Sequence, residues 1–298
     1  MSSVSLYCCV IVMLLLSGCT AKNVRLGSID GEQMPPGILE QEILSLAARG
    51  KERILKFRSP DGFFATAQSV PREIEEQMRL KKSWKNGCPV ALTDLSYLLI
   101  THWDFDGEPR VGQLMVHREL AFPVIRTFAD LFAAHYPIER MELIEKYDGD
   151  DDRSMAANNT SAFNCRDVTG KPGVYSKHSY GGAIDINPIQ NPYITPQNDP
   201  LKNMGWDGSE DKGLFLRRSG YDAKSPVYAF CTKRPNDCLV LPPAAIAHTA
   251  RNPSSPGQLH PGSAAVKAFT DRGFDWGGSW LRLLDYQHFE YDSAKLQK

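Results

Sequence analysis

Apolar side chains between residues 117 and 135 recur every three or four positions, at Ala121, Val124, Ile125, Phe128, Leu131 and Phe132. This spacing places them on one face of a helix, so the pattern predicts an amphipathic helix that buries that face. Weaker patterns predict helices over 38–48, 71–84 and 263–272. The second has proline in its first turn, and the third has Ser263 as its cap and Gly273 as its stop.

Alternating and β-branched stretches predict the strands. The strongest cover 91–100 and 110–116, separated by a turn, and another over 140–144 follows the long helix. Two shorter strands carry polar side chains, one around Asp185 and one over 285–291. Strands that are interleaved with helices, but joined by hairpin-like turns, predict an α+β domain with a mainly antiparallel sheet.

Composition narrows the class of protein without identifying it. The chain has 298 residues, of which 42% are hydrophobic and 23% charged, as is ordinary for a globular protein. This length allows one large domain or two small ones. The formal net charge of -1 offers no electrostatic attraction for nucleic acid, so we expect no nucleic-acid partner.

The N-terminus has the pattern of an export signal. A mostly apolar run over 6–16 is too short to span a bilayer as a mature helix, and Ser17-Gly18-Cys19 follows it. This ending resembles a bacterial lipobox, in which Cys19 carries lipid and becomes the mature N-terminus. No Lys or Arg precedes the run, although a signal peptide normally begins with positive charge. An ordinary cleaved signal and a start codon placed too far downstream are therefore alternative interpretations. Thr20 is consistent, by the same resemblance, with the periplasmic face of the outer membrane.

Four cysteines remain once the signal and Cys19 are set aside: Cys88, Cys165, Cys231 and Cys238. An even number in an exported chain predicts two disulfides, with three possible pairings. The segment between Cys231 and Cys238 is rich in turn residues and would close easily into a hairpin, which leaves Cys88 to pair with Cys165. The alternative for Cys165 is a role as a metal ligand beside Arg166.

One stretch holds the strongest chemical signal. His178 and Asp185 lie seven residues apart, with Gly181 and Gly182 between them. The glycines permit a tight turn, so a histidine on the loop and an aspartate on the following strand would meet at one point. An imidazole nitrogen and a carboxylate oxygen that converge in this way indicate a zinc site.

The predicted strand near the C-terminus supplies a third ligand. His288 would complete a His-Asp-His set with one coordination position open, which is typical of a catalytic zinc. Asp285 lies three residues earlier, near enough to take a proton from a water at the metal without being a ligand itself.

These residues resemble a known family. Ser-x-His-x-x-Gly-x-Ala-x-Asp over 176–185, followed by Asp-x-x-His-Phe-Glu over 285–290, is similar to the zinc D-alanyl-D-alanine carboxypeptidases. That family includes D-Ala-D-Ala dipeptidases and phage L-alanyl-D-glutamate endopeptidases, and it shares its fold with the Hedgehog signalling domain. The resemblance covers about 84–291, and one branch of the family is closest at 87–90, 158–166 and 186–193.

The resemblance implies a fold and a domain plan. The fold would be α+β and Hedgehog/DD-peptidase-like, with a mainly antiparallel sheet and flanking helices around a zinc cleft. We therefore predict a lipoprotein signal peptide over 1–18, a tether and N-terminal extension over 19–70, and a zinc peptidase catalytic domain over 71–298.

It also implies roles for the site residues. His178, Asp185 and His288 would hold one zinc ion per chain, and Asp285 would be the general base, where many relatives have Glu. Ser176 and Tyr180 frame His178 and are predicted to bind substrate, although Ser176 has a loop cap as an equal alternative.

An arginine is the remaining catalytic candidate, because peptide hydrolysis needs positive charge beside the developing oxyanion. Arg166, in the loop that leads to His178, is predicted to supply it. Arg153 competes, because relatives place such an arginine just after the preceding strand, and a surface ion pair is the alternative for either. The acidic run over 148–152 lacks the ligand pattern of an EF-hand and is predicted to be a solvated loop.

The function implied is hydrolysis of an amide that involves a D-amino acid in the stem peptides of peptidoglycan, by an exported and lipid-anchored enzyme. The bond could be that of a D-Ala-D-Ala carboxypeptidase or of an L-Ala-D-Glu endopeptidase. A binding lipoprotein of the same fold without turnover, and a zinc amidase, are the alternatives. The oligomeric state and the biological role do not follow from the sequence.

Membrane attachment gives the first testable prediction. Cys19→Ala removes the acceptor of the lipid, so the protein should move from the membrane fraction to the soluble fraction. Fractionation and mass spectrometry of the N-terminal peptide measure this. Unchanged membrane association, with no lipid mass on that peptide, would contradict the lipoprotein interpretation.

Overall fold

The computed structural model describes residues 54–168, 171–197, 226–280 and 283–296. The chain divides into two compact units, Met1–Glu32 and Gln33–Lys298, and all described residues belong to the second. The predicted signal and the predicted helix over 38–48 lie outside the described residues. Within the described ranges, no helix is long and apolar enough to cross a membrane.

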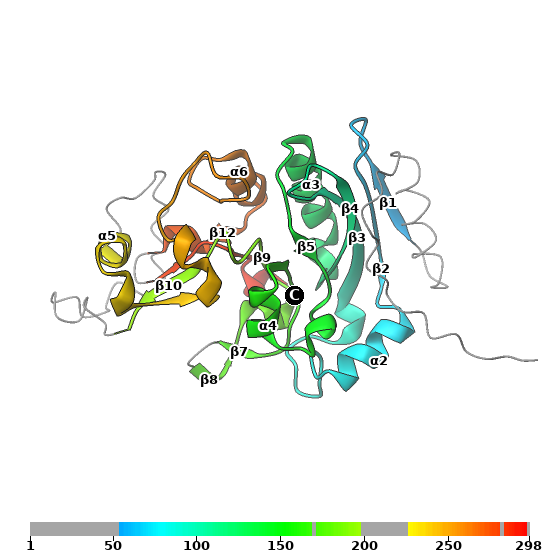
Figure 1. Cartoon of the computed structure of the whole chain (residues 1–298). Helices are drawn as coiled ribbons and strands as arrows, with labels where there is room; N and C mark the ends of the chain where they lie inside the picture. Colours follow the sequence, from blue (N-terminus) through cyan, green and yellow to red (C-terminus); the bar gives the residue numbers. More distant parts are fainter. Residues whose placement is uncertain (1–53, 169–170, 198–225, 281–282, 297–298) are drawn as a thin grey trace, which may run out of the picture. The chain divides into compact units, whose positions relative to one another are not determined.

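Four antiparallel strands form the largest sheet, in the order β1-β2-β3-β4 (Figure 1). They are β1 (Leu55–Arg58), β2 (Phe64–Ser69), β3 (Leu95–Trp103) and β4 (Pro109–His117). The predicted hairpin is therefore confirmed, with β3 starting later than predicted because Leu92–Asp94 forms a 3₁₀ turn. The carboxylate of Asp104 closes the hairpin by accepting bonds from the backbone N–H groups of Asp106 and Glu108.

The predicted boundary at residue 70 stays a prediction, but the packed part of the extension has a defined place. β1 and β2 precede that boundary, and β2 pairs with β3 from Ala65 to Ser69. The extension thus contributes two strands to the sheet. Phe63 and Ala65 bury their side chains in the same core cluster as the long helix.

The long helix, α3 (Ala121–Ala133), covers this sheet and contacts both β2 and β3. It is shorter than predicted because the 3₁₀ turn Arg118–Leu120 precedes it. The predicted apolar face is buried, as the periodicity requires. The helix also contacts α6 (Ala264–Thr270), so it packs against both the sheet and a second helix.

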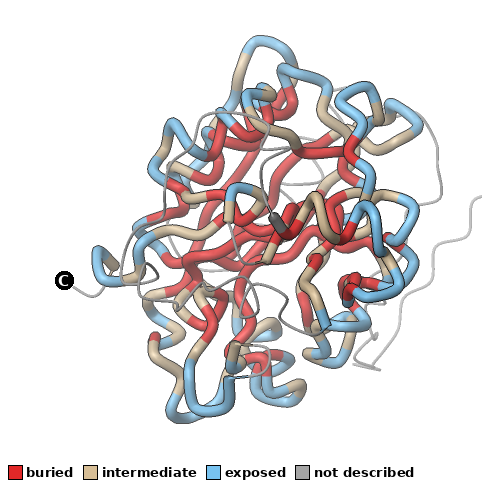
Figure 2. Tube along the Cα trace, turned by 90° about the vertical axis from the view of Figure 1, so that its left-hand side faces the viewer, coloured by how far each residue is buried: buried red, intermediate tan, exposed pale blue. Residues whose placement is uncertain are grey.

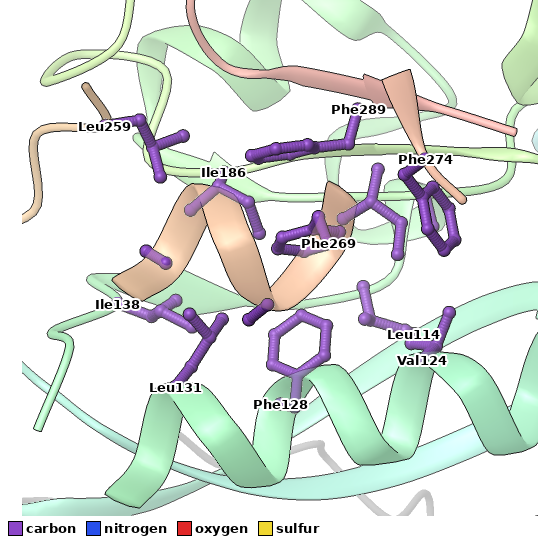
Figure 3. Close-up of a cluster of buried hydrophobic side chains, with 14 of the residues drawn as sticks. Leu114, Val124, Phe128, Leu131, Ile138, Ile186, Leu259, Phe269, Phe274 and Phe289 are labelled. Atoms are coloured by element: carbon purple, nitrogen blue, oxygen red, sulfur yellow. The ribbon is translucent and has the colours of Figure 1, made fainter. Parts of the chain in front are cut away.

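Aromatic packing links α3 to the C-terminal strands (Figure 3). Phe128 of α3 meets Phe269 of α6 edge to face, with ring centroids 6.2 Å apart. Phe269 then stacks on Phe289 at 3.9 Å. All three side chains are essentially inaccessible to solvent. Since stacked and edge-to-face pairs each add about 0.5–1.5 kcal/mol beyond burial, this column holds the C-terminal strand against the helices.

Two small antiparallel sheets carry the polar motifs around Asp185 and His288. One has the order β12-β14-β9 and contains β12 (Asp275–Trp276), β14 (His288–Glu290) and β9 (Ala183–Asp185). The other has the order β11-β10-β13 and contains β11 (Cys238–Leu241), β10 (Tyr193–Pro196) and β13 (Leu284–Asp285).

The prediction of one strand over 285–291 is wrong, because the segment is two strands. β13 ends at Asp285 and pairs with β10, whereas β14 starts at His288 and pairs with β9 and β12. The two residues between them, Tyr286 and Gln287, turn the chain from one sheet to the other. Alternation along the sequence is the same in both halves, so it could not reveal the change of partner.

The other elements are short. They are α2 (Arg72–Leu80), β5 (Arg140–Met141), α4 (Asp151–Ala156), β6 (Asn159–Thr160), β7 (Asp167–Val168), β8 (Lys171–Tyr175) and α5 (Pro226–Lys233). The predictions at 71–84 and 140–144 are thus confirmed in type but not in length. The predicted cap and stop of α6 are confirmed: Ser263 Oγ accepts from Val266 N, and Gly273 has a φ of +86°.

Burial follows these elements (Figure 2). Strands β3 and β9, the second half of β4 and the apolar face of α3 are mostly buried, while the connecting segments are mostly exposed. The mixture of helix and mainly antiparallel sheet agrees with the predicted α+β class. One exception is the parallel pair of β5 and β6.

Both predicted disulfides are present, Cys88–Cys165 and Cys231–Cys238. The second joins α5 to the start of β11 rather than the two arms of a hairpin. Cys165 as a metal ligand is therefore wrong, since its sulfur is bonded to Cys88.

The two disulfides should differ in their effect on stability. Their cysteines are 77 and 7 residues apart. Loop-closure entropy predicts a loss of about 4.5 kcal/mol in the free energy of unfolding for Cys88→Ala/Cys165→Ala, against about 2.5 kcal/mol for Cys231→Ala/Cys238→Ala. Urea unfolding of the two double variants measures the difference. Equal losses, or a larger loss from the short loop, would contradict the prediction.

Candidate metal centre

His178 lies on a short 3₁₀ turn, Lys177–Tyr180, that Ser176 caps. The hydroxyl of Ser176 accepts a bond from the backbone N–H of His178 at 3.3 Å. The turn ends at Gly181, which has a φ of +66°. A Cβ at Gly181 would lie 2.4 Å from the backbone nitrogen of His117, so only glycine fits both the conformation and the space.

Strand pairing brings the other two predicted ligands together. Asp185 ends β9 and His288 begins β14, and the two residues lie directly opposite each other in the antiparallel ladder. Residues opposite each other in such a ladder have their side chains on the same face. The turn at Gly181 then delivers His178 to that face.

The three side chains converge on one point. His288 Nδ1 lies 2.9 Å from Asp185 Oδ1, and His178 Nε2 lies 3.2 Å from Asp185 Oδ2. The two ring nitrogens are 3.3 Å apart. All three ligand atoms lie within 4.8 Å of one another, and all three residues are buried.

This donor set fits a metal ion. Two imidazole nitrogens and a carboxylate oxygen are the ligands that zinc uses in catalytic sites with an open position. The second nitrogen of His178 is already engaged, because Nδ1 lies 2.5 Å from the carbonyl oxygen of Ala162. A carbonyl can only accept, so Nδ1 carries the hydrogen and the lone pair of Nε2 faces the cluster.

Electrostatics within the cluster favour a cation. Burial alone would raise the pKa of Asp185, but the neighbouring His178 and His288 hold that pKa well below its usual range. Burial alone would lower the pKa of His288, but hydrogen bonds to Asp185 and Glu290 raise it. A buried carboxylate that stays ionised provides the negative charge that a bound cation requires.

Asp285 lies beside the cluster but is not part of it. Its Oδ1 atom is buried and has no hydrogen-bond partner among the described residues. Burial, reinforced by the negative charge of Asp185, raises the pKa of Asp285 to about 7, against the opposing effect of His288. Gly277 leaves room for the Asp285 side chain, since a Cβ on residue 277 would lie only 2.9 Å from Asp285 Cβ.

The two candidate arginines differ sharply in their surroundings. Arg166 Nη2 lies 2.7 Å from Asp151 Oδ2, and its Nε is buried with no hydrogen-bond partner in the described part of the chain. The backbone N–H of Arg166 also donates to Ser179 Oγ, on the turn that carries His178. Arg153 instead pairs with Asp148 at the surface, with 64% of its side chain exposed.

The prediction that residues 148–152 form a solvated loop is wrong at its C-terminal end. Asp150 caps α4 by accepting from Arg153 N, and Asp151 begins that helix. Burial raises the pKa of Asp151, opposed by the charges of Arg166 and His178. Counting charges along the sequence could not distinguish this buried aspartate from its exposed neighbours.

Ser176 and Tyr180 each have a structural contact. Ser176 forms the cap described above, which is one of its two predicted roles. Tyr180 packs against the smaller core cluster, which includes Phe163 and Cys165. Substrate binding by either residue stays a prediction.

Three neighbours of the cluster were not predicted. Glu290 Oε2 lies 3.2 Å from His288 Nε2, the carbonyl of Ala162 holds His178, and the ring of Trp280 lies 5.5 Å from that of His288. Glu290 was detectable, because residues two apart on a strand share a face. Nothing in the sequence marks a backbone carbonyl as the partner of a histidine.

The geometry thus defines a mixed helix and sheet protein with a buried two-histidine, one-carboxylate cluster and a neighbouring carboxyl. A family model described as D-alanyl-D-alanine carboxypeptidase matches residues 169–291. The match supports a peptidase of that family and contains the whole cluster and Asp285, although it covers less than half of the chain. No curated protein and no solved structure matches the chain.

Metal binding is directly testable. His178→Ala, Asp185→Ala and His288→Ala each remove one of three ligands, so metal retained after zinc loading and desalting should fall to background. Elemental analysis measures it. His260→Ala, which changes a histidine outside the cluster, serves as the control and should retain metal like the unaltered protein. Full retention by any ligand variant would exclude that residue from the metal site.

Proposed function

We propose that this protein is a zinc peptidase with the Hedgehog/DD-peptidase fold. Its substrate would be an amide bond involving a D-amino acid in peptidoglycan stem peptides. One observation carries the proposal: His178, Asp185 and His288 place their ligand atoms within 4.8 Å of one another in a buried site. The family match over 169–291 supports the reaction class.

His178 Nε2, His288 Nδ1 and a carboxylate oxygen of Asp185 would hold the zinc ion. Bound there, zinc would supply a Lewis acid that polarises the scissile carbonyl and makes water a better nucleophile near neutral pH. The ionised Asp185 balances part of the cation's charge inside the protein.

Asp285 would move the proton. A carboxyl whose pKa is about 7 can both accept a proton from the attacking water and return it to the leaving amine. Its buried Oδ1, which has no partner among the described residues, is free to make these contacts. Asp185 and Asp285 thus have opposite pKa shifts, as expected for two carboxyl groups with different roles.

Arg166 would stabilise the oxyanion that develops on the scissile carbonyl. Its guanidinium is oriented by Asp151, and its backbone is attached to the His178 turn through Ser179. A positive charge held in a partly buried position acts more strongly than one in water. Arg153, at the surface with Asp148, is the weaker choice for this role.

Two features bear on the alternatives. A binding protein without turnover has no need of a buried carboxyl such as Asp285, which costs free energy to desolvate. The family match supports a peptidase rather than an amidase that releases the whole stem. The product analysis described below determines which stem-peptide bond is cut.

Export and lipid anchoring remain part of the proposal. Two disulfides are typical of exported proteins, because reducing compartments keep thiols free. Attachment through Cys19 to the periplasmic face of the outer membrane would place the enzyme beside its polymer substrate.

Product analysis tests the function. Purified peptidoglycan and isolated stem peptides are incubated with the zinc-loaded protein, and the products are separated by chromatography and mass spectrometry. Free D-Ala indicates a carboxypeptidase, and a cut within the stem indicates an endopeptidase. Release of the whole stem would indicate an amidase, and no product, with substrate still bound, would indicate a binding protein. The last two outcomes contradict the proposal.

Asp285→Asn separates metal binding from chemistry. Asparagine has nearly the same volume and removes no ligand, so metal should remain while proton transfer fails. Activity should fall at least about 10²- to 10⁴-fold, the usual contribution of a general acid–base group. Asp292→Asn, which alters an exposed carboxylate near the C-terminus, is the matched control and should keep full activity. Loss of metal from Asp285→Asn would make Asp285 a ligand instead.

A further inference from the structure

Glu290 contacts one histidine of the metal cluster from outside the cluster. It lies two residues after His288 on β14, so both side chains point to the same face of the strand. Glu290 Oε2 is 3.2 Å from His288 Nε2. Only 16% of the Glu290 side chain and 9% of the His288 side chain are exposed, so the contact is largely shielded from solvent.

The contact determines which nitrogen of His288 carries hydrogen. A neutral imidazole has one donor nitrogen and one acceptor nitrogen, and an ionised carboxylate can only accept. Nε2–H therefore donates to Glu290. When a zinc ion takes the place of the proton on Nδ1, which lies 2.9 Å from Asp185 Oδ1 and 3.3 Å from His178 Nε2, the Nδ1 lone pair faces the ion. The other tautomer would direct an N–H at the metal position and set two lone pairs against each other at Glu290.

His178 shows the same arrangement with a different acceptor. The carbonyl of Ala162 accepts from its Nδ1, so Nε2 faces the cluster. The two histidines thus present opposite nitrogens to the same point, and each is held by an acceptor on its far side. The acceptor for His178 is neutral and belongs to the backbone, whereas that for His288 is a charged side chain that a substitution can remove.

We propose that Glu290 is a positioning residue for the metal: it orients the His288 ring, keeps Nδ1 as the ligand atom and so strengthens zinc binding. This inference rests on the zinc site of the proposed function. It assigns Glu290 a role different from that of Asp285, because the Glu290 carboxylate acts through the histidine and not on the substrate. Carboxylates that hold metal-bound histidines typically change metal affinity by about 10- to 100-fold.

The test compares zinc affinity, measured by competition with a chromophoric chelator without substrate, in matched variants. Glu290→Ala should bind zinc about 10- to 100-fold more weakly than the unaltered protein. Glu290→Gln keeps an acceptor oxygen but loses the charge, so its affinity should fall between the two. Asp275→Asn changes the residue opposite Glu290 on β12 and should bind zinc like the unaltered protein.

A spectroscopic measurement separates positioning from a general structural role. Long-range ¹H–¹⁵N correlation of the histidine rings in the zinc-loaded protein should show His288 with hydrogen on Nε2 and none on Nδ1. Glu290→Ala should shift the His288 Nε2–H resonance and speed the exchange of that hydrogen with water, while the His178 Nδ1–H signal is unchanged. Urea unfolding of the metal-free variants identifies any loss of affinity that is due to unfolding.

The outcomes distinguish the inference from the proposed function. If the unaltered protein binds no zinc, the metal site itself is wrong. If it binds zinc and folded Glu290→Ala binds equally well with the same His288 Nε2–H signal, only the role of Glu290 is overturned. Complete loss of zinc from folded Glu290→Ala and Glu290→Gln would make Glu290 a direct ligand, which also overturns the positioning role.

Discussion

The antiparallel register between β9 and β14 places Asp185 opposite His288, and the metal cluster depends on this pairing. Opposed side chains have Cβ atoms about 4.5–5.5 Å apart, near enough to share one ion. A slip of one residue would turn every side chain of β14 to the other face. Phe289 opposes such a slip, because it occupies the core between the two site residues His288 and Glu290 and stacks on Phe269. The hydrophobic core therefore sets the position of the polar site.

The position of Asp285 relative to His288 depends on the turn between β13 and β14. Tyr286 is held on three sides: its N–H donates to Pro192 O, its carbonyl accepts from Trp276 Nε1 at 2.9 Å, and Arg251 lies 4.2 Å above its ring. Because this turn joins two sheets, holding it fixes the separation between Asp285, the general-base candidate, and His288, the third candidate ligand. Cation–π and hydrogen-bond contacts outside the site thereby contribute to its geometry.

Burial gives the acidic groups of the site different properties. Asp185 lies between two histidines and stays ionised, whereas Asp285, with fewer favourable partners, has a raised pKa. Asp151, whose side chain is 20% exposed, is paired with Arg166. Identical side chains thus differ in pKa because their neighbours differ, as the proposed roles of Asp185 in metal binding and of Asp285 in proton transfer require.

The amino-acid sequence by itself determined the local features. The spacing of apolar residues predicted α3, the alternation predicted β3 and β4, and Ser263 and Gly273 predicted the ends of α6, since each depends on residues near one another in the chain. The glycines between His178 and Asp185 predicted the turn for the same reason. The cysteines indicated both disulfides, because few pairings were possible.

Only the tertiary structure decided which distant residues meet. It divided 285–291 between two sheets and paired Asp151 with Arg166. It also left Arg153 exposed beside Asp148 and brought Glu290 into contact with His288. Each of these facts depends on strand partners or on burial. Residues far apart in the sequence create both, so no local pattern records them.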